Sequence, residues 1–91
     1  MLEIVFDNRA RDDLLALPKS IQKKIFIAVE KKLCKYPELF GTRLRGKLKD
    51  FWKLRVGDYR IGYIPDKKRV IIRAIGNRKD VYRILERRIR A

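Results

Sequence analysis

A two-residue turn between two alternating segments constrains this chain more than any other feature. Gly57-Asp58 separates residues 52–56 (WKLRV) from residues 59–63 (YRIGY), and Gly-Asp is one of the dipeptides typical of tight β-hairpins. A two-residue turn fixes the register, so Arg55 is predicted to face Arg60. Because side chains alternate across a sheet, the hairpin has one apolar and one cationic face. The apolar face is predicted to hold Trp52, Leu54, Val56, Tyr59, Ile61 and Tyr63, and the cationic face Lys53, Arg55 and Arg60.

A third strand is predicted after a second turn. Residues 65–68 (PDKK) suit a connection built on a type I turn, in which proline fixes φ at the second position. This turn predicts that Ile64 pairs with Arg69 and that Arg73 joins the cationic face, while Val70, Ile72 and Ala74 join the apolar face. Like charges directly across a ladder repel one another, so a bound polyanion would stabilise the cationic face.

The remaining segments predict one strand and three helices. Residues 2–6 (LEIVF) are typical of a strand, and the Asp-Asn pair at residues 7–8 offers the N-cap of a helix that ends before Pro18. Ser20 is predicted to cap a second helix with its own apolar stripe. A last helix is predicted after Asp80, with Val81, Ile84, Leu85 and Ile89 on one side and Arg83, Arg87, Arg88 and Arg90 elsewhere.

These elements predict an α+β fold in a single domain spanning residues 1–91. Its parts are a small antiparallel sheet, an N-terminal helix hairpin packed on the apolar face, and a short C-terminal helix, around one modest core. With the hairpin on the apolar face, we expect the cationic face to stay open. No apolar run approaches the roughly 20 residues of a membrane span. Together with a single cysteine, Cys34, and no signal-peptide pattern, this predicts a cytoplasmic protein without a membrane partner.

The charge of the chain indicates the kind of partner. The formal net charge is +14, and it is uneven: residues 1–41 carry a balance of +2 and residues 42–91 a balance of +12. Such a basic region is typical of a surface that binds nucleic acid, because neutralising phosphates releases counterions. An acidic protein partner fits the same charge equally well.

The residue types limit the chemistry. The chain has no histidine, which removes the usual acid–base pair of metal-free ribonucleases and makes a zinc site improbable. Its carboxylates are scattered over turns, a cap and the first helix, and there is no phosphate-binding glycine loop. We therefore expect no metal and no cofactor, and any phosphodiester chemistry has to use Lys, Arg and Tyr.

Three motifs carry a resemblance to a known family. They are residues 44–46 (LRG), residues 52–63 (WKLRVGDYRIGY) and residues 76–82 (GNRKDVY), and together they resemble the RelE branch of the RelE/ParE toxin superfamily. The resemblance covers nearly the whole chain. It implies a RelE-like α+β toxin of a type II toxin–antitoxin system that cleaves messenger RNA in the ribosomal A site. It also implies a cognate antitoxin as partner, a toxin that is monomeric alone, and a hetero-oligomeric complex.

The resemblance assigns roles to individual residues. Lys53, Arg60, Arg78 and Tyr82 match catalytic positions of the family, and Arg45 and Arg55 match basic positions that contact RNA. Lys49 and Arg73 complete the predicted RNA-binding set. Phe51 departs from the pattern, because some members carry a second lysine there.

The chemistry of RNA cleavage agrees with these assignments. Attack of a ribose 2′-OH on its own phosphate requires a base, stabilisation of the phosphorane-like charge, and protonation of the leaving 5′ oxygen. Arg60 and Arg78 can donate forked hydrogen bonds to phosphate oxygens. We hypothesise Lys53 or Tyr82 as the base, Arg78 as the acid or leaving-group stabiliser, and Arg60 at the transition-state charge; unchanged cleavage by both Arg60→Ala and Arg78→Ala would refute this.

Two other functions remain open from the sequence. A ParE-like inhibitor of DNA gyrase shares the fold and has no nuclease activity. A non-catalytic basic RNA-binding module is the second alternative, and Phe51 is its best support.

Overall fold

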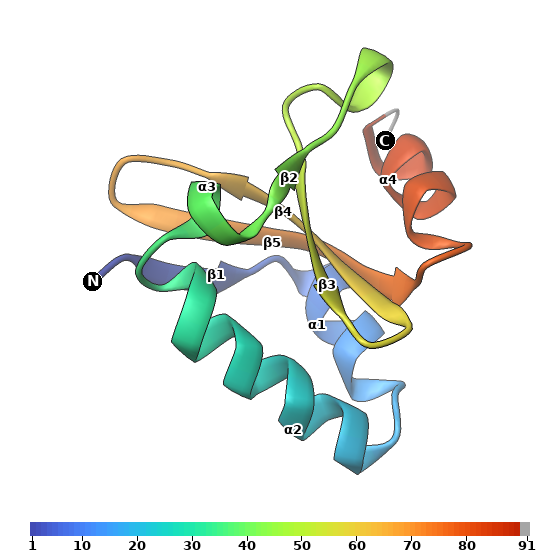
Figure 1. Cartoon of the computed structure of the whole chain (residues 1–91). Helices are drawn as coiled ribbons and strands as arrows, with labels where there is room; N and C mark the ends of the chain where they lie inside the picture. Colours follow the sequence, from blue (N-terminus) through green and yellow to red (C-terminus); the bar gives the residue numbers. More distant parts are fainter. Residues whose placement is uncertain (90–91) are drawn as a thin grey trace.

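A five-stranded sheet forms the centre of the molecule (Figure 1). The computed structural model describes residues 1–89 of the chain. The strand order is β1-β5-β4-β3-β2. Predictions that concern Arg90 and Ala91 lie outside the described residues. The elements are β1 (Glu3–Phe6), α1 (Asn8–Leu15), α2 (Lys19–Ala28), α3 (Pro37–Phe40), β2 (Thr42–Arg43), β3 (Trp52–Val56), β4 (Tyr59–Pro65), β5 (Arg69–Asn77) and α4 (Val81–Ile89), with a π-helical turn at Val29–Leu33 and a 3-10 turn at Gly46–Leu48.

The predicted hairpin is confirmed in its register. Strands β3 and β4 pair antiparallel with Arg55 opposite Arg60, Lys53 opposite Gly62 and Val56 opposite Tyr59. Gly57 has φ of 60°, the left-handed conformation that the tight turn requires and that glycine adopts without steric cost. The turn therefore determines which residues of the two strands share a face.

The predicted register of β5 is wrong. Ile64 pairs with Ile71, not with Arg69, and the ladder shifts between Gly62 and Tyr63. Tyr63 is opposite Ile72 and Gly62 is opposite Ala74, which leaves Arg73 as an extra residue on β5, a β-bulge. A bulge reverses the alternation beyond it, so Ala74 packs on the face opposite to the one predicted, and Ile75 takes its place in the main core.

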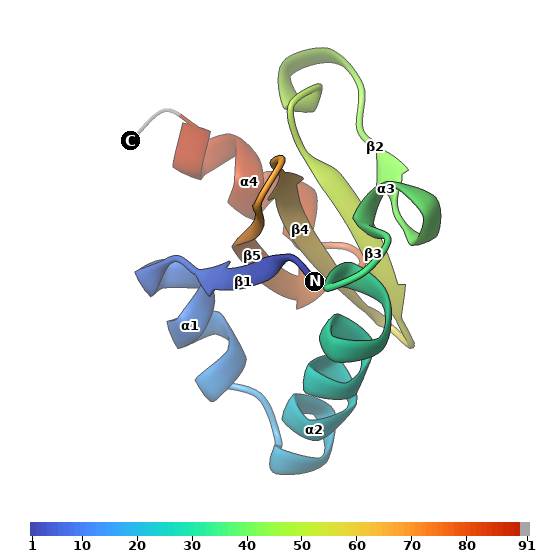
Figure 2. The same ribbon diagram turned by 90° about the vertical axis from the view of Figure 1, so that its left-hand side faces the viewer.

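The N-terminal helices cover one face of the sheet, as predicted (Figure 2). The N-cap of α1 is Asp7, whose carboxylate accepts from the backbone N–H of Ala10. Ser20 is not the cap of α2, because this helix begins after Pro18 without a side-chain cap. Strand β1 extends the otherwise antiparallel sheet by pairing parallel to β5. The main core between helices and sheet consists of Ala10, Leu14, Ile25, Val29, Leu33, Leu54, Ile61, Tyr63, Val70, Ile72 and Ile75.

The second face of the sheet is not open, which corrects the expectation from sequence. Helix α4 packs on it through Val81 and Leu85, and these join a second core with Leu48, Phe51 and Ala74. Two glycines of the sheet allow α4 to pack closely, because they have no side chain in its way. A Cβ at Gly62 would lie 2.9 Å from a methyl of Leu85, and one at Gly76 would lie 3.2 Å from Cδ1 of Ile84. The cationic side chains of this face therefore emerge beside a helix.

Candidate functional site

The site begins with a contact between Lys53 and Tyr82. The Lys53 ammonium donates a hydrogen bond of 3.1 Å to the Tyr82 hydroxyl, and Nζ lies 5.4 Å from the centre of the phenol ring. Lys53 comes from the middle of β3 and Tyr82 from the first turn of α4, and both are half-buried. Docking of α4 on the sheet therefore brings together two predicted catalytic residues that are 29 positions apart.

Arg60 and Arg55 lie next to this pair on the sheet. They face each other across β3 and β4, two pairs closer to the hairpin turn than Lys53 and its partner Gly62. The Arg60 Nη1 donates to the carbonyls of Gly57 and Tyr59, each at 2.9 Å, so the guanidinium is held over the turn. Arg55 is exposed.

Arg78 approaches the same turn from another element. It lies in the connection between β5 and α4, and its backbone N–H donates to the carbonyl of Asp58 at 2.9 Å. Its side chain is exposed. Arg60 and Arg78 are thus both anchored to residues 57–58, at the end of the sheet where α4 begins.

The predicted RNA-binding residues fall into two groups. Arg45 and Lys49 flank the 3-10 turn and are exposed, as is Arg55. Arg73 differs, because its Nε pairs with the Asp7 carboxylate at 3.0 Å and its guanidinium lies 5.8 Å from the centre of the Phe51 ring. The ion pair with Asp7 competes with any phosphate for Arg73.

Phe51 is part of the second core and is only 5% exposed. A lysine placed there would have its stem in the second core and its ammonium close to the Arg73 guanidinium, which lies 5.8 Å from the centre of the Phe51 ring. The position that carries a second lysine in some relatives is therefore a packing position in this chain. Lys49 is exposed nearby on the other side of Asp50.

Sequence reasoning missed a network of ion pairs at the β5 bulge. Arg88 of α4 binds Asp13 of α1 through two hydrogen bonds, of 2.7 and 2.8 Å, and each side chain is only 15% exposed. The hydrogen bonds to Asp13 raise the pKa of Arg88 above its usual value, against the effect of burial. With the Asp7–Arg73 pair these residues form what we call the bulge network. No local motif could have indicated it, because Asp13 and Arg88 are 75 positions apart.

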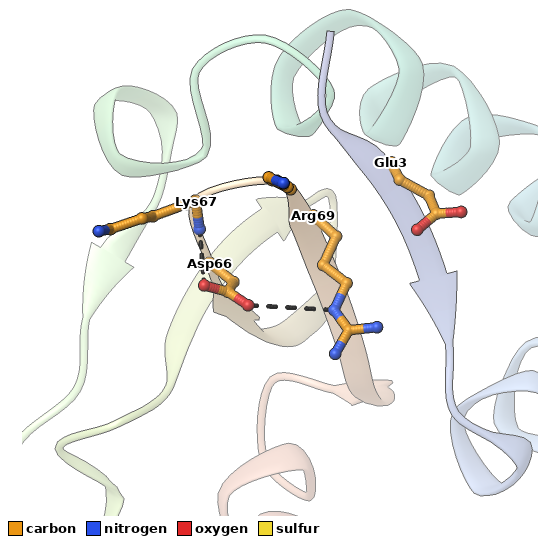
Figure 3. Close-up of a pocket in the computed structure, with 5 residues that line it drawn as sticks. Glu3, Asp66, Lys67 and Arg69 are labelled. Carbon is orange, nitrogen blue, oxygen red and sulfur yellow. Dashed lines mark hydrogen bonds and ion pairs between the residues drawn. The ribbon is translucent and has the colours of Figure 1, made fainter.

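A hollow of the surface lies at a different place from these residues. A hollow of about 460 Å³ is lined by Glu3, Asp66, Lys67, Lys68 and Arg69, at the β4–β5 turn (Figure 3). Asp66 accepts from the backbone N–H of Lys67 and lies 4.0 Å from Nε of Arg69. The hollow is lined by none of the predicted site residues.

Within residues 1–89, no three His, Cys, Asp or Glu side chains gather in a way that could hold a metal ion. None of the helices described is both long and apolar enough to cross a membrane.

Comparison with known proteins gives a family match over most of the chain. Residues 4–82 match the family described as ParE toxin of type II toxin-antitoxin system, parDE. No curated protein matches the chain.

Solved structures of toxin–antitoxin complexes share the fold. The RelBE2 complex from Mycobacterium tuberculosis contains a chain with 30% identity and a TM-score of 0.80, covering 87% of this chain and 93% of that one. The RelBE complex from E. coli matches with 26% identity and a TM-score of 0.70, covering 85% and 96%. The ParDE system from P. aeruginosa, at 15% identity, a TM-score of 0.69 and the same coverage, shows the fold alone.

Proposed function

The chain belongs to the RelE/ParE toxin superfamily of type II toxin–antitoxin systems, as its motifs predicted, and from this premise we propose that it is a ribosome-dependent endoribonuclease. Its substrate is messenger RNA in the ribosomal A site. Among the matched structures, the toxins from RelBE complexes share up to 30% identity with this chain, which favours the RelE branch.

One observation carries the proposal: the contact between the Lys53 ammonium and the Tyr82 hydroxyl at 3.1 Å, on a sheet whose hairpin turn also binds the Arg60 guanidinium and the Arg78 backbone. A scattered basic surface needs no such pairing of a cation with a phenol. The pair consists of two groups that can exchange a proton, and the neighbouring arginines are cations that can stabilise developing phosphoryl charge; phosphodiester cleavage requires both. Exposed Arg45, Lys49 and Arg55 extend this area for contacts to RNA phosphates.

The reaction uses the message as its own nucleophile. One residue of the Lys53–Tyr82 pair is the base that removes the proton of a ribose 2′-OH. The other residue positions that base through their hydrogen bond. The 2′ oxygen forms a bond to phosphorus, Arg60 stabilises the charge on the phosphoryl oxygens, and the bond to the 5′ oxygen breaks. Arg78 stabilises the leaving 5′ oxygen, which takes a proton from solvent, and the base releases to solvent the proton that it took from the 2′-OH. The products are a 2′,3′-cyclic phosphate and a 5′-hydroxyl, so no water is consumed.

Primer extension on a defined message in a translation extract tests the proposal. Wild-type protein should produce breaks at A-site codons only when ribosomes are present. Arg78→Ala and Tyr82→Phe should each slow cleavage about a hundredfold, which is typical of losing a proton-transfer or charge-stabilising group. Tyr36→Phe is the matched control, because Tyr36 is 57% exposed and lies far along the chain from the site. Intact messages in the wild-type reaction would refute the nuclease function.

The match to the ParE description favours a second candidate, inhibition of DNA gyrase. A supercoiling assay separates the two: inhibition of supercoiling at protein levels that leave messages intact would replace the nuclease proposal. Buried Phe51 favours the third possibility, a binding module without catalysis, in which neither assay would show an effect and expression would not harm cells.

We also propose a cognate antitoxin as partner. The RelBE relatives at 30% and 26% identity were solved as toxin–antitoxin complexes. A net charge of +14 favours an acidic antitoxin. In this proposal the toxin alone is a monomer, its complex with the antitoxin is a hetero-oligomer, and both are cytoplasmic.

A further inference from the structure

The bulge network joins three elements that are distant in sequence. Asp7 and Asp13 belong to α1 and its cap, Arg73 to β5, and Arg88 to the last turn of α4. All four side chains are at least about three-quarters buried. An arginine–carboxylate pair with two parallel hydrogen bonds is rigid as well as strong, so the Asp13–Arg88 contact fixes the geometry between α1 and α4.

The network also satisfies the backbone of the bulge. The N–H of Ile75 donates to Oδ2 of Asp13 at 3.0 Å, and the carbonyl of Arg73 accepts from Nη1 of Arg88 at 2.9 Å. Polar backbone groups that are part-buried and outside the ladder are costly unless they find a partner. The bulge and the ion pair therefore depend on each other, and α4 is bound to β5 as well as to α1.

Helix α4 requires such anchoring because it is short. It has nine residues, and isolated helices below about 12 residues are marginal in water. Its middle is held by Ile84 and Leu85, which contact the positions of Gly76 and Gly62, and its end is held by Arg88. Docking and helix formation are thus coupled, and Tyr82 is carried by this helix.

We propose that the Asp13–Arg88 ion pair is a positioning device for the candidate site: it keeps α4 docked and thereby keeps the Tyr82 hydroxyl on the Lys53 ammonium. Asp13 and Arg88 are positioning residues, since within residues 1–89 neither forms a hydrogen bond or ion pair with Lys53 or Tyr82. The effect of this ion pair on catalysis rests on the proposed function. Its effect on the Lys53–Tyr82 contact is independent of that function.

Hydrogen exchange and NMR of the free protein test the proposal without ribosomes. Arg88→Ala should raise the exchange rates of α4 amides about tenfold or more relative to β4 amides. It should also move the Tyr82 ring signals toward their values in a Lys53→Met variant. Arg87→Ala is the matched control, because Arg87 is exposed on the same helix and has no ion pair among the described residues. This control should change neither measurement, and the ring signals of exposed Tyr36 serve as a reference.

Two milder variants guard against loss of the whole fold. Asp13→Asn keeps an acceptor for the Ile75 N–H but removes the charge, and Arg88→Lys keeps a cation without the paired donors. Both should loosen α4 selectively, less than Arg88→Ala does. If Arg88→Ala exchanges like Arg87→Ala, the proposal is wrong. If Arg88→Ala unfolds the entire protein, the two milder variants decide. The proposal is then wrong if both variants keep the α4 exchange rates and the Tyr82 ring signals of the wild type.

The cleavage assay adds a separate outcome. At saturating ribosomes, Arg88→Ala should cut the cleavage rate about tenfold with little change in the ribosome concentration needed for half-maximal rate, because fewer molecules hold Tyr82 in place. Arg87→Ala should match the wild type. A wild-type protein that fails to cleave would refute the proposed function alone, and the exchange and NMR results would still decide the positioning role.

Discussion

Tyr63 shows at the scale of one residue how closely the main core is packed. Its ring is fully buried, its hydroxyl donates to the carbonyl of Pro37, and a Cβ at Gly41 would overlap that hydroxyl. Gly41→Ala should therefore lower the free energy of unfolding by about 1–3 kcal/mol, the usual cost of overpacking. Chemical denaturation measures this. Adding Tyr63→Phe removes the overlapping oxygen, so the double variant should lose less stability than the two single losses combined; full additivity would contradict this explanation.

The same residue predicts a pH dependence. Burial, and then the charge of Glu38, raise the pKa of Tyr63 well above its ordinary value of 10.0. The unfolded chain therefore loses this proton at lower pH than the folded protein. The stabilising effect is complete below pH 10 and declines as the pH rises from there through the folded pKa. Urea titrations at pH 8 to 11 should show a smaller alkaline loss of stability in Tyr63→Phe than in wild type; equal losses would contradict it.

Some single residues could be placed from the sequence and others could not. Strand alternation correctly predicted buried positions for Leu54, Ile61 and Tyr63, because a two-residue turn fixed their register. Arg73 was predicted on an open cationic face, whereas it pairs with Asp7, 66 positions away. A contact of that range depends on tertiary packing and leaves no periodic signal.

At the scale of elements, the bulge in β5 separates what the sequence predicted from what it did not. The helix hairpin, the strands and α4 follow from their periodicity and flanking residues. The register of β5 failed because the turn is centred one residue later than predicted, with Pro65 paired to Val70, and because Arg73 is inserted opposite the Gly62–Tyr63 step. Gly62 inside a strand was the available signal, since glycine there often accompanies a bulge or a close approach. The face that α4 covers depends on this same glycine.

Asp7 links two elements, and its two roles can be separated. One carboxylate oxygen caps α1 at the N–H of Ala10, and the other pairs with Arg73. Asp7→Ala should destabilise the protein by about 1–2 kcal/mol through loss of the cap and its charge. Asp7→Asn retains a capping oxygen and should cost about half as much. Asp12→Ala, at an exposed position of α1, controls for a lost charge, and thermal unfolding gives all three values. Equal effects of Asp12→Ala and Asp7→Ala would refute the role of the cap.

At the scale of the whole molecule, charge opposes the compact state. Twenty-five cations against eleven carboxylates leave a net charge of +14 on 91 residues, and Arg55 faces Arg60 directly. Four ion pairs are described within residues 1–89, so most of the cations have no carboxylate partner there. Self-repulsion of this kind weakens as salt shortens the distance over which charges act. The fold therefore keeps a cationic surface at a cost in stability, which a polyanion or an acidic partner reduces.

This balance predicts how salt affects the folded protein. Raising sodium chloride from low to physiological ionic strength should raise the melting temperature by several degrees, since screening relieves more repulsion than it removes attraction. Phosphate at equal ionic strength should raise it further, because anions that bind only the folded state stabilise it by mass action. Arg60→Ala should lose that additional increment and keep the chloride effect, as its guanidinium lies where the proposed phosphate charge develops. A melting temperature independent of salt would show that the surface charge is already balanced, and equal phosphate and chloride effects in the wild type would show that the cationic face selects no phosphate.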